Sequence, residues 1–386
     1  MIITNTPPLS VYFPGKLVFA NGSLGDLPAE IINTGCNNAF ILTIEPLIAV
    51  LQQFVKQLKS NNISVSINTG IQQEPSFTDF ENILSEAKKI APDLIIGIGG
   101  GSVLDVAKLV AAQLDNDQSI NEIVGIGFLK GRNKKLICVP ATSGTGSEVS
   151  PNAILVDDSD GQKKGIISPH LVPDIVYVDP LLTISVPPAV TAATGLDALT
   201  HCMEAYTNKF SHPFIDVYAL EGMRLIAANL VQAVRNGDDE NARYQVAMGS
   251  LLGGFCLGPV NTAGVHALSY PLGSTFHLAH GLSNALLLPY VMAYNMVETP
   301  ERYANVAVAL GCTKGASDCE TAKKGIEKIK ELITECKVIA RLRDLDIPQS
   351  AIPSMAKDAL KIQRLLKNNP RHISEEDAID IYNQAY

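Results

Sequence analysis

The first half of the chain alternates short apolar runs with segments of helical spacing, and this alternation limits the folds open to it. Six runs of four to six residues are expected to be strands: 39–44, 63–67, 93–98, 136–139, 153–157 and 175–178. Apolar residues spaced as on one face of a helix predict helices over 46–60, 77–90 and 103–114. Because strands that alternate with helices build βαβ units, we expect an α/β domain with a parallel sheet covered on both faces.

The sequence changes character after the segment 179–188, which holds three prolines. Helices are expected from there to the C-terminus, over 188–207, 214–235, 239–257, 260–270, 281–294, 301–309, 319–342, 350–358 and 374–384. Pro213, Pro259, Pro271 and Pro289 are expected to separate them. Since 386 residues exceed one ordinary core, we predict two domains, an α/β domain over 1–182 and an all-helical domain over 183–386.

The composition excludes several classes of protein. The net charge of −9, with no run of Lys or Arg, argues against nucleic acid as a partner. Seven cysteines, an odd number without a CxxC pair, predict free thiols in a reducing compartment. The chain does not open on a basic stretch followed by an apolar one, and its longest apolar run is interrupted by glycines, Asp105 and Lys108. We therefore expect no signal peptide, no membrane span and a cytoplasmic location.

A glycine-rich loop joins the predicted strand 93–98 to the helix after it. Its glycines are Gly97, Gly99, Gly100 and Gly101, followed by Ser102. Backbone without Cβ atoms can approach a phosphate closely, and a helix N-terminus supplies free N–H groups. The pattern is not the GxGxxG fingerprint after a first strand. The loop predicts a phosphate contact, with a tight turn capped by Ser102 as the alternative.

Three further features fit a dinucleotide. Glu45 follows the first predicted strand, where a carboxylate can accept from the ribose hydroxyls of NAD and repel the 2′-phosphate of NADP. The loop 140–152 offers neutral hydroxyl donors, among them Thr142 and Ser143. Lys163 and Lys164 lie between two predicted strands and could reach a phosphate or ribose. A solvated loop charge for Glu45 and a solvated hairpin tip for the lysines are the alternatives.

Histidines and one aspartate in the second half predict a metal site. Asp197 and His201 stand four residues apart, so on a helix both side chains share one face. His266 and His280 lie in a stretch of small and apolar residues, and His277 stands three before His280. One carboxylate and three imidazoles are a typical ligand set for a divalent transition metal. The alternative is that such histidines are ordinary core or cleft residues.

Three motifs in the same order along nearly the whole chain resemble the iron-containing alcohol dehydrogenase family. They are GGGSVLDVAK (99–108), TSGTGSEV (142–149), and GLDALTH (195–201) with the later HALSYPLG (266–273) and HGLSNA (280–285). The resemblance implies a nucleotide-binding α/β domain and a helical metal domain, as in dehydroquinate synthase-like proteins, with the site in the cleft between them.

The resemblance also implies roles for individual residues. It implies the metal ligands Asp197, His201, His266 and His280. It implies Gly99, Gly100 and Ser102 at the pyrophosphate, with Thr142, Ser143 and Lys164 along the dinucleotide. Two positions depart from the family. Tyr270 stands where many members have a histidine four residues after the third ligand, and Ala141 replaces a threonine.

The expected activity is hydride transfer between NAD(H) and a small alcohol or aldehyde at a divalent metal, Fe²⁺ before Zn²⁺. His277 and Tyr270 are the candidates for proton transfer. No Lys or Arg occurs in 187–207 or 255–290, which favours an uncharged substrate. The alternative is a non-redox lyase or a polyol dehydrogenase on the same scaffold. We expect a homo-oligomer, since dimers are the commonest assemblies.

Overall fold

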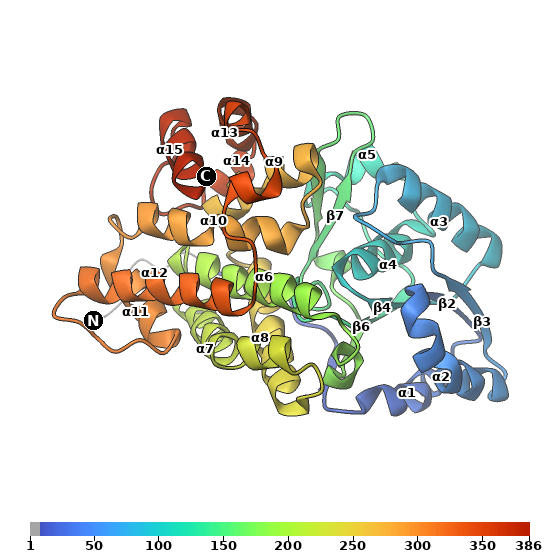
Figure 1. The fold of residues 1–386 in the computed structure, drawn as a ribbon. Helices are drawn as coiled ribbons and strands as arrows, with labels where there is room; N and C mark the ends of the chain where they lie inside the picture. Colours follow the sequence, from blue (N-terminus) through green and yellow to red (C-terminus); the bar gives the residue numbers. More distant parts are fainter. Residues whose placement is uncertain (1–7) are drawn as a thin grey trace. The chain divides into compact units, whose positions relative to one another are not determined.

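The computed structural model describes residues 8–386, which divide into two compact units (Figure 1). One unit comprises Tyr12–Thr142 and Gly146–Thr183, and the other comprises Ile184–Tyr386, Ser143–Thr145 and, of the described N-terminal residues, 8–11. Each unit has its own buried apolar clusters. The expectation that no signal peptide is present rests partly on residues 1–7, which lie outside the described residues.

The first unit is built on a six-stranded sheet in the order β1-β9-β6-β4-β2-β3, and all its pairs are parallel. The strands are β1 Lys16–Phe19, β2 Asn38–Leu42, β3 Ser64–Asn68, β4 Leu94–Gly99, β6 Lys135–Pro140 and β9 Ile175–Val178. The predicted α/β class and parallel sheet are thus confirmed. Three of the predicted strands, 39–44, 93–98 and 136–139, are the central strands β2, β4 and β6, which are almost wholly buried.

Alternate residues of β2 bury against different helices. Ala39 and Ile41 share a cluster with residues of α1 (Leu27–Asn33) and α2 (Ile48–Ser60). Phe40 and Leu42 share a cluster with residues of α3 (Phe77–Ile90) and α4 (Gly101–Gln113). Because successive side chains of a strand point to opposite faces, a strand with helices on both sides must be apolar throughout.

A second, smaller sheet was not expected from the sequence. It has the order β5-β8-β7, with strands β5 Gly125–Ile126, β8 Lys163–Ile167 and β7 Asn152–Val156. Lys163 and Lys164 do lie between the two predicted strands, β7 and β9, but they begin a further strand, β8, that the sequence did not predict. The segment is short and only partly apolar, and its pairing with β7 decides its conformation. The short elements β1, α1, α5 (Ile120–Ile123) and α14 (Gln363–Leu366) were also missed.

The second unit is helical, as predicted. Its longer helices are α6 Pro188–Thr207, α7 Pro213–Arg235, α8 Glu240–Leu257, α9 Gly264–Phe276, α10 His280–Asn295, α11 Pro300–Ala309, α12 Asp318–Glu335, α13 Ile352–Leu360 and α15 Glu375–Ala385. None of the helices within 8–386 combines the length and apolar character needed to cross a bilayer. The seven cysteines are free thiols, as expected.

Two prolines behave differently from the prediction. Pro271 and Pro289 lie inside α9 and α10 and do not separate helices. A proline removes one backbone hydrogen bond and bends a helix. On either side of Pro271, however, Leu268 and Leu272 are fully buried in the core of the unit. Packing of the apolar face therefore carries the helix through the proline, which local sequence rules cannot anticipate.

Candidate metal centre

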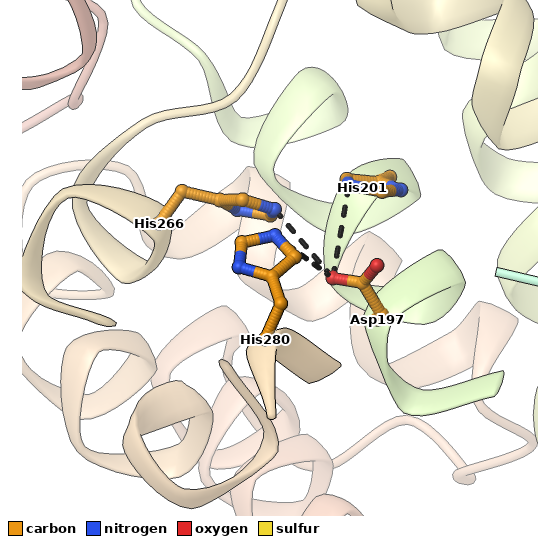
Figure 2. A group of neighbouring side chains, drawn as sticks. All are labelled: Asp197, His201, His266 and His280. Atoms are coloured by element: carbon orange, nitrogen blue, oxygen red, sulfur yellow. Dashed lines mark ion pairs between the residues drawn. The ribbon is translucent and has the colours of Figure 1, made fainter. Parts of the chain in front are cut away.

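Four side chains from three helices of the second unit converge on one point (Figure 2). Asp197 and His201 come from α6, His266 from α9, and His280 is the first residue of α10. Oδ1 of Asp197 lies 3.7 Å from Nε2 of His201, 3.6 Å from Nε2 of His266 and 3.7 Å from Nε2 of His280. One donor atom from each residue lies within 4.8 Å of the other three.

These distances fit a bound cation. Ligands about 2.1 Å from a tetrahedral ion stand roughly 3.4 Å from one another, close to the 3.6–3.7 Å between Asp197 and the three imidazoles. A set of three nitrogens and one oxygen suits Fe²⁺, Zn²⁺, Co²⁺ or Mn²⁺. The residues therefore fit a divalent transition metal in both geometry and donor chemistry.

Close helix packing brings the four residues together. A Cβ atom added to Gly281, next to His280, would stand only 2.2 Å from the carbonyl oxygen of Ala193 on α6. Only glycine therefore lets the start of α10 approach α6 so closely. The start of α6 is in turn held by the buried Arg243, which donates to Oγ1 of Thr191 at 2.7 Å and to the carbonyl of Val186 at 3.2 Å.

Because the site is buried, the charges of its side chains interact strongly and shift one another's pKa values. Burial alone would raise the pKa of Asp197, but the imidazoles of His201, His280 and His266 outweigh it and hold the pKa well below the usual range. Burial lowers the pKa of His201, although Asp197 partly offsets this. For His266 the opposing effects of Glu204 and Asp197 exceed the effect of burial and raise the pKa to about 9. The carboxylate is thus ionised, as a ligand must be.

Two residues that the sequence reasoning missed contact the four. Glu204 accepts from the backbone N–H of Val265 at 2.6 Å, and its other oxygen lies 2.6 Å from Nδ1 of His266. Asn284 donates to Oδ1 of Asp197 at 2.7 Å. Helical spacing carried a signal for both, since Glu204 stands seven residues after Asp197 on α6 and Asn284 four after His280 on α10.

The two candidates for proton transfer are placed differently. The ring of Tyr270 lies 6.3 Å from that of His280, edge to face, and its hydroxyl accepts from Arg364 at 2.7 Å. His277 is the exposed C-terminal cap of α9, with a left-handed backbone (φ 55°). Tyr270 therefore adjoins the convergent group, whereas none of the contacts found among residues 8–386 joins the His277 side chain to it.

The glycine loop joins β4 to α4 in the first unit. β4 ends at Gly99, Gly100 caps α4, and Gly101 and Ser102 form its first turn. A Cβ on Gly99 would come within 2.8 Å of Val103, so this glycine is required for packing. A Cβ on Gly100 would meet only Thr142, at 3.4 Å. Two of the residues predicted to contact the dinucleotide, Gly100 and Thr142, are thus neighbours.

The remaining predicted cofactor residues are dispersed. Glu45 is exposed and begins a short 3-10 helix, Glu45–Leu47, shortly after β2. Ser143 falls within the short segment Ser143–Thr145 that belongs to the helical unit. Lys164 pairs with Asp160 at 2.5 Å and Asp157 at 3.8 Å beside the turn before β8. These contacts fit the solvated hairpin alternative for Lys164, and its contact with a cofactor stays a prediction.

The motif 99–108 and the motif 142–149 are linked by a buried polar network. Lys108 is fully buried and donates to Oγ of Ser147 at 2.8 Å and to the carbonyl of Asn152 at 2.6 Å. Oγ of Ser147 donates to Asp105 at 2.5 Å, and the other carboxylate oxygen of Asp105 accepts from the N–H of Ile154 at 3.0 Å. The network ties α4 to the loop that carries Thr142.

Comparison with protein families adds independent information. Residues 14–180 match the family described as iron-containing alcohol dehydrogenase, and residues 191–386 match the Fe-containing alcohol dehydrogenase family, C-terminal. The chain is 37% identical over 382 residues to long-chain-alcohol dehydrogenase 1 of Geobacillus thermodenitrificans, covering 97% of this chain and 96% of that protein.

Solved structures agree in fold. A 1,3-propanediol oxidoreductase superposes with a TM-score of 0.94 at 32% identity, covering 98% of this chain and 100% of that one. The sulfoacetaldehyde reductase of Bifidobacterium kashiwanohense, determined in complex with NAD⁺, gives a TM-score of 0.88 at 25% identity and covers 98% and 99% of the two chains.

Proposed function

Because the chain belongs to the iron-containing alcohol dehydrogenase family, we propose that it transfers hydride between NAD(H) and a small alcohol or aldehyde at a metal ion held by Asp197, His201, His266 and His280. The family assigns the reaction class, so the chain is an oxidoreductase that interconverts alcohols and aldehydes and uses a metal and a nicotinamide cofactor. The comparisons support this chemistry and not the lyase alternative.

The observation that carries the proposal is the convergence of one oxygen and three nitrogens from residues far apart in the sequence. When bound there, a divalent ion supplies Lewis acidity, which lowers the pKa of an alcohol and polarises a carbonyl. The four side chains hold the cation, and three of them are almost fully buried while His280 is 27% exposed. We propose that the ion is Fe²⁺, with Zn²⁺ as the second choice, in keeping with the name of the family.

For the cofactor we propose NAD and not NADP. The supporting observations are the glycine loop before α4, the neighbouring Thr142, and the exposed Glu45, a carboxylate suited to ribose hydroxyls and not to a 2′-phosphate. The reductase from B. kashiwanohense was determined with NAD⁺. Gly99, Gly100, Gly101, Ser102, Ser143 and Lys164 complete the proposed cofactor residues.

For the substrate we propose a small uncharged alcohol or aldehyde, because 187–207 and 255–290 contain no Lys or Arg. The relatives named above act on long-chain alcohols, on 1,3-propanediol and on sulfoacetaldehyde. Arg364 is brought against Tyr270, and its guanidinium is engaged by the tyrosine hydroxyl. We propose that Tyr270, in preference to His277, handles the proton, since the ring of Tyr270 adjoins that of His280.

Three broader proposals go with this function. We propose two domains, 1–182 and 183–386, and these bounds are similar to those of the two compact units. We propose a cytoplasmic location, supported by the seven free cysteines. We also propose a homo-oligomer, since dimers are the commonest assemblies of soluble enzymes.

One experiment tests the function. The purified protein is analysed for bound metal and screened for NADH oxidation with a series of small aldehydes, alongside His280→Ala and a matched control, His170→Ala, whose side chain is exposed in the first unit. We expect about one metal per chain and turnover in the wild type and the control, and loss of turnover with retained NADH binding in His280→Ala. Turnover that survives in His280→Ala would remove the metal site from the reaction.

A further inference from the structure

The side chain of Asn284 lies among the proposed metal ligands. It is fully buried one turn after His280 on α10. Its Nδ2 lies 2.7 Å from Oδ1 of Asp197, 3.1 Å from Nε2 of His266 and 3.2 Å from Nε2 of His280. These are three of the four atoms that converge on one point.

The orientation of this amide is dictated by Asp197. Oδ1 of Asn284 is buried and has no hydrogen-bond partner within the described chain, which is a costly arrangement. The reverse orientation would set an amide oxygen 2.7 Å from a carboxylate oxygen, both of them acceptors. The side chain thus leaves its own oxygen unsatisfied in order to present N–H groups to the ligands.

The second N–H of the amide constrains the two imidazoles. An amide has two N–H groups, and with one on Asp197 the other points between Nε2 of His266 and Nε2 of His280. An imidazole nitrogen accepts a hydrogen bond only with the lone pair that also binds a metal. For His266, Glu204 contacts the opposite nitrogen, Nδ1. In the neutral ring that a metal requires, Glu204 and Asn284 therefore favour the same tautomer from the two sides of the ring.

We propose that Asn284 is a positioning residue for the metal ion, which orients the carboxylate of Asp197 and, before the ion binds, holds the Nε2 lone pairs of His266 and His280 toward the site. The inference rests on the proposed function, since it takes the ion to be held by these ligands. A carboxylate oxygen has lone pairs for both an N–H and a cation, so the bond between Asn284 and Asp197 persists beside the ion. Asn284 then sets the affinity for the ion and the geometry of its coordination.

The test compares variants of the full-length, metal-loaded protein. Asn284→Ala removes the amide, and Asn284→Leu removes it while keeping the volume, in case the cavity left by alanine prevents folding. The matched control is Asn295→Ala, because Asn295 is also a buried asparagine of α10 but pairs with Asn369. Titration with a chromophoric chelator measures affinity for Zn²⁺ and Co²⁺, the visible absorption of the Co²⁺ form reports its coordination, and circular dichroism reports folding.

We expect either Asn284 variant to bind both ions about 10–100-fold more weakly, with a changed Co²⁺ spectrum and unchanged circular dichroism. The control should keep the affinity and spectrum of the wild type. Wild-type affinity and spectrum in a folded Asn284 variant, or an equal loss in Asn295→Ala, would overturn the inference. His201→Ala separates the two proposals: if it binds the ions as the wild type does, the metal site itself fails, whereas if it alone loses them, only the role of Asn284 fails.

Discussion

Oε2 of Glu204 lies 2.6 Å from Nδ1 of His266, the ring nitrogen on the far side from Asp197. A carboxylate there makes Nδ1 the protonated nitrogen and leaves Nε2 free for a metal. We predict that Glu204→Gln, which keeps the shape but loses the charge, weakens metal binding about 10–100-fold. Chelator titration measures the change. Glu221→Gln, at an exposed ion pair on α7, is the control, and equal affinities in the two variants would contradict the role of Glu204.

Replacing Glu45 by alanine should relax the preference for NAD over NADP. The side chain is exposed beyond β2, where we propose that it accepts from the ribose hydroxyls and repels a 2′-phosphate. The ratio of kcat/KM for the two reduced cofactors is the measurement. Glu81→Ala, which removes an exposed carboxylate from α3, should leave the ratio unchanged. If Glu45→Ala also leaves it unchanged, the carboxylate is only a surface charge.

Tyr270→Phe should slow turnover most at high pH, where protons are scarce, if the hydroxyl relays them. The hydroxyl accepts from Arg364 at 2.7 Å, and it retains an O–H of its own as a donor. The pH profile of kcat for aldehyde reduction is the measurement. Tyr290→Phe, at a half-buried tyrosine of α10, is the control. A profile that is displaced equally at every pH would assign Tyr270 a packing role only.

Glu148 should make the protein less stable as the pH rises. Burial, partly offset by a backbone hydrogen bond and Lys108, raises the pKa of its carboxyl to about 7 from 4.5. The folded protein therefore retains a proton that the unfolded chain releases between these values, so the free energy of unfolding falls by on the order of 3 kcal/mol across the interval. Glu148→Gln should flatten this dependence. Denaturation midpoints at pH 5 and pH 8 measure it, and equal slopes in both proteins would contradict the prediction.

Lys108→Met should destabilise the first unit strongly. Its ammonium is fully buried, lies 3.8 Å from Asp105 and is bridged to it by Ser147. Removing one partner leaves the largely buried Asp105 without its countercharge, at a cost of about 3–5 kcal/mol. Denaturant unfolding measures the loss, with Lys88→Met at an exposed position of α3 as the control. Equal stability of the two variants would show that Asp105 does not depend on Lys108.

Local patterns were enough to predict the architecture. The helix over 77–90 and the helix over 188–207 have the bounds that apolar spacing indicates, because each has a capping residue or proline at its start and an amphipathic or wholly buried pattern along its length. The shared helix face of Asp197 and His201 followed from spacing, the small and apolar surroundings of His266 and His280 made them candidates as well, and the family resemblance implied the same four ligands. Elements without a local apolar pattern, such as β8 with its two lysines, were not predicted.

The sequence by itself determined most of the strands and helices and which residue types could bind a cation, because periodicity and side-chain chemistry are properties of a local stretch. Only the tertiary structure decided the partners: Glu204 with His266, Asn284 with Asp197, Lys108 with Ser147, and Arg364 with Tyr270. These pairs are separated by between 39 and 94 residues. They meet because helices pack at particular depths and rotations, as the approach of Gly281 to Ala193 illustrates, and no local pattern encodes where two distant surfaces touch.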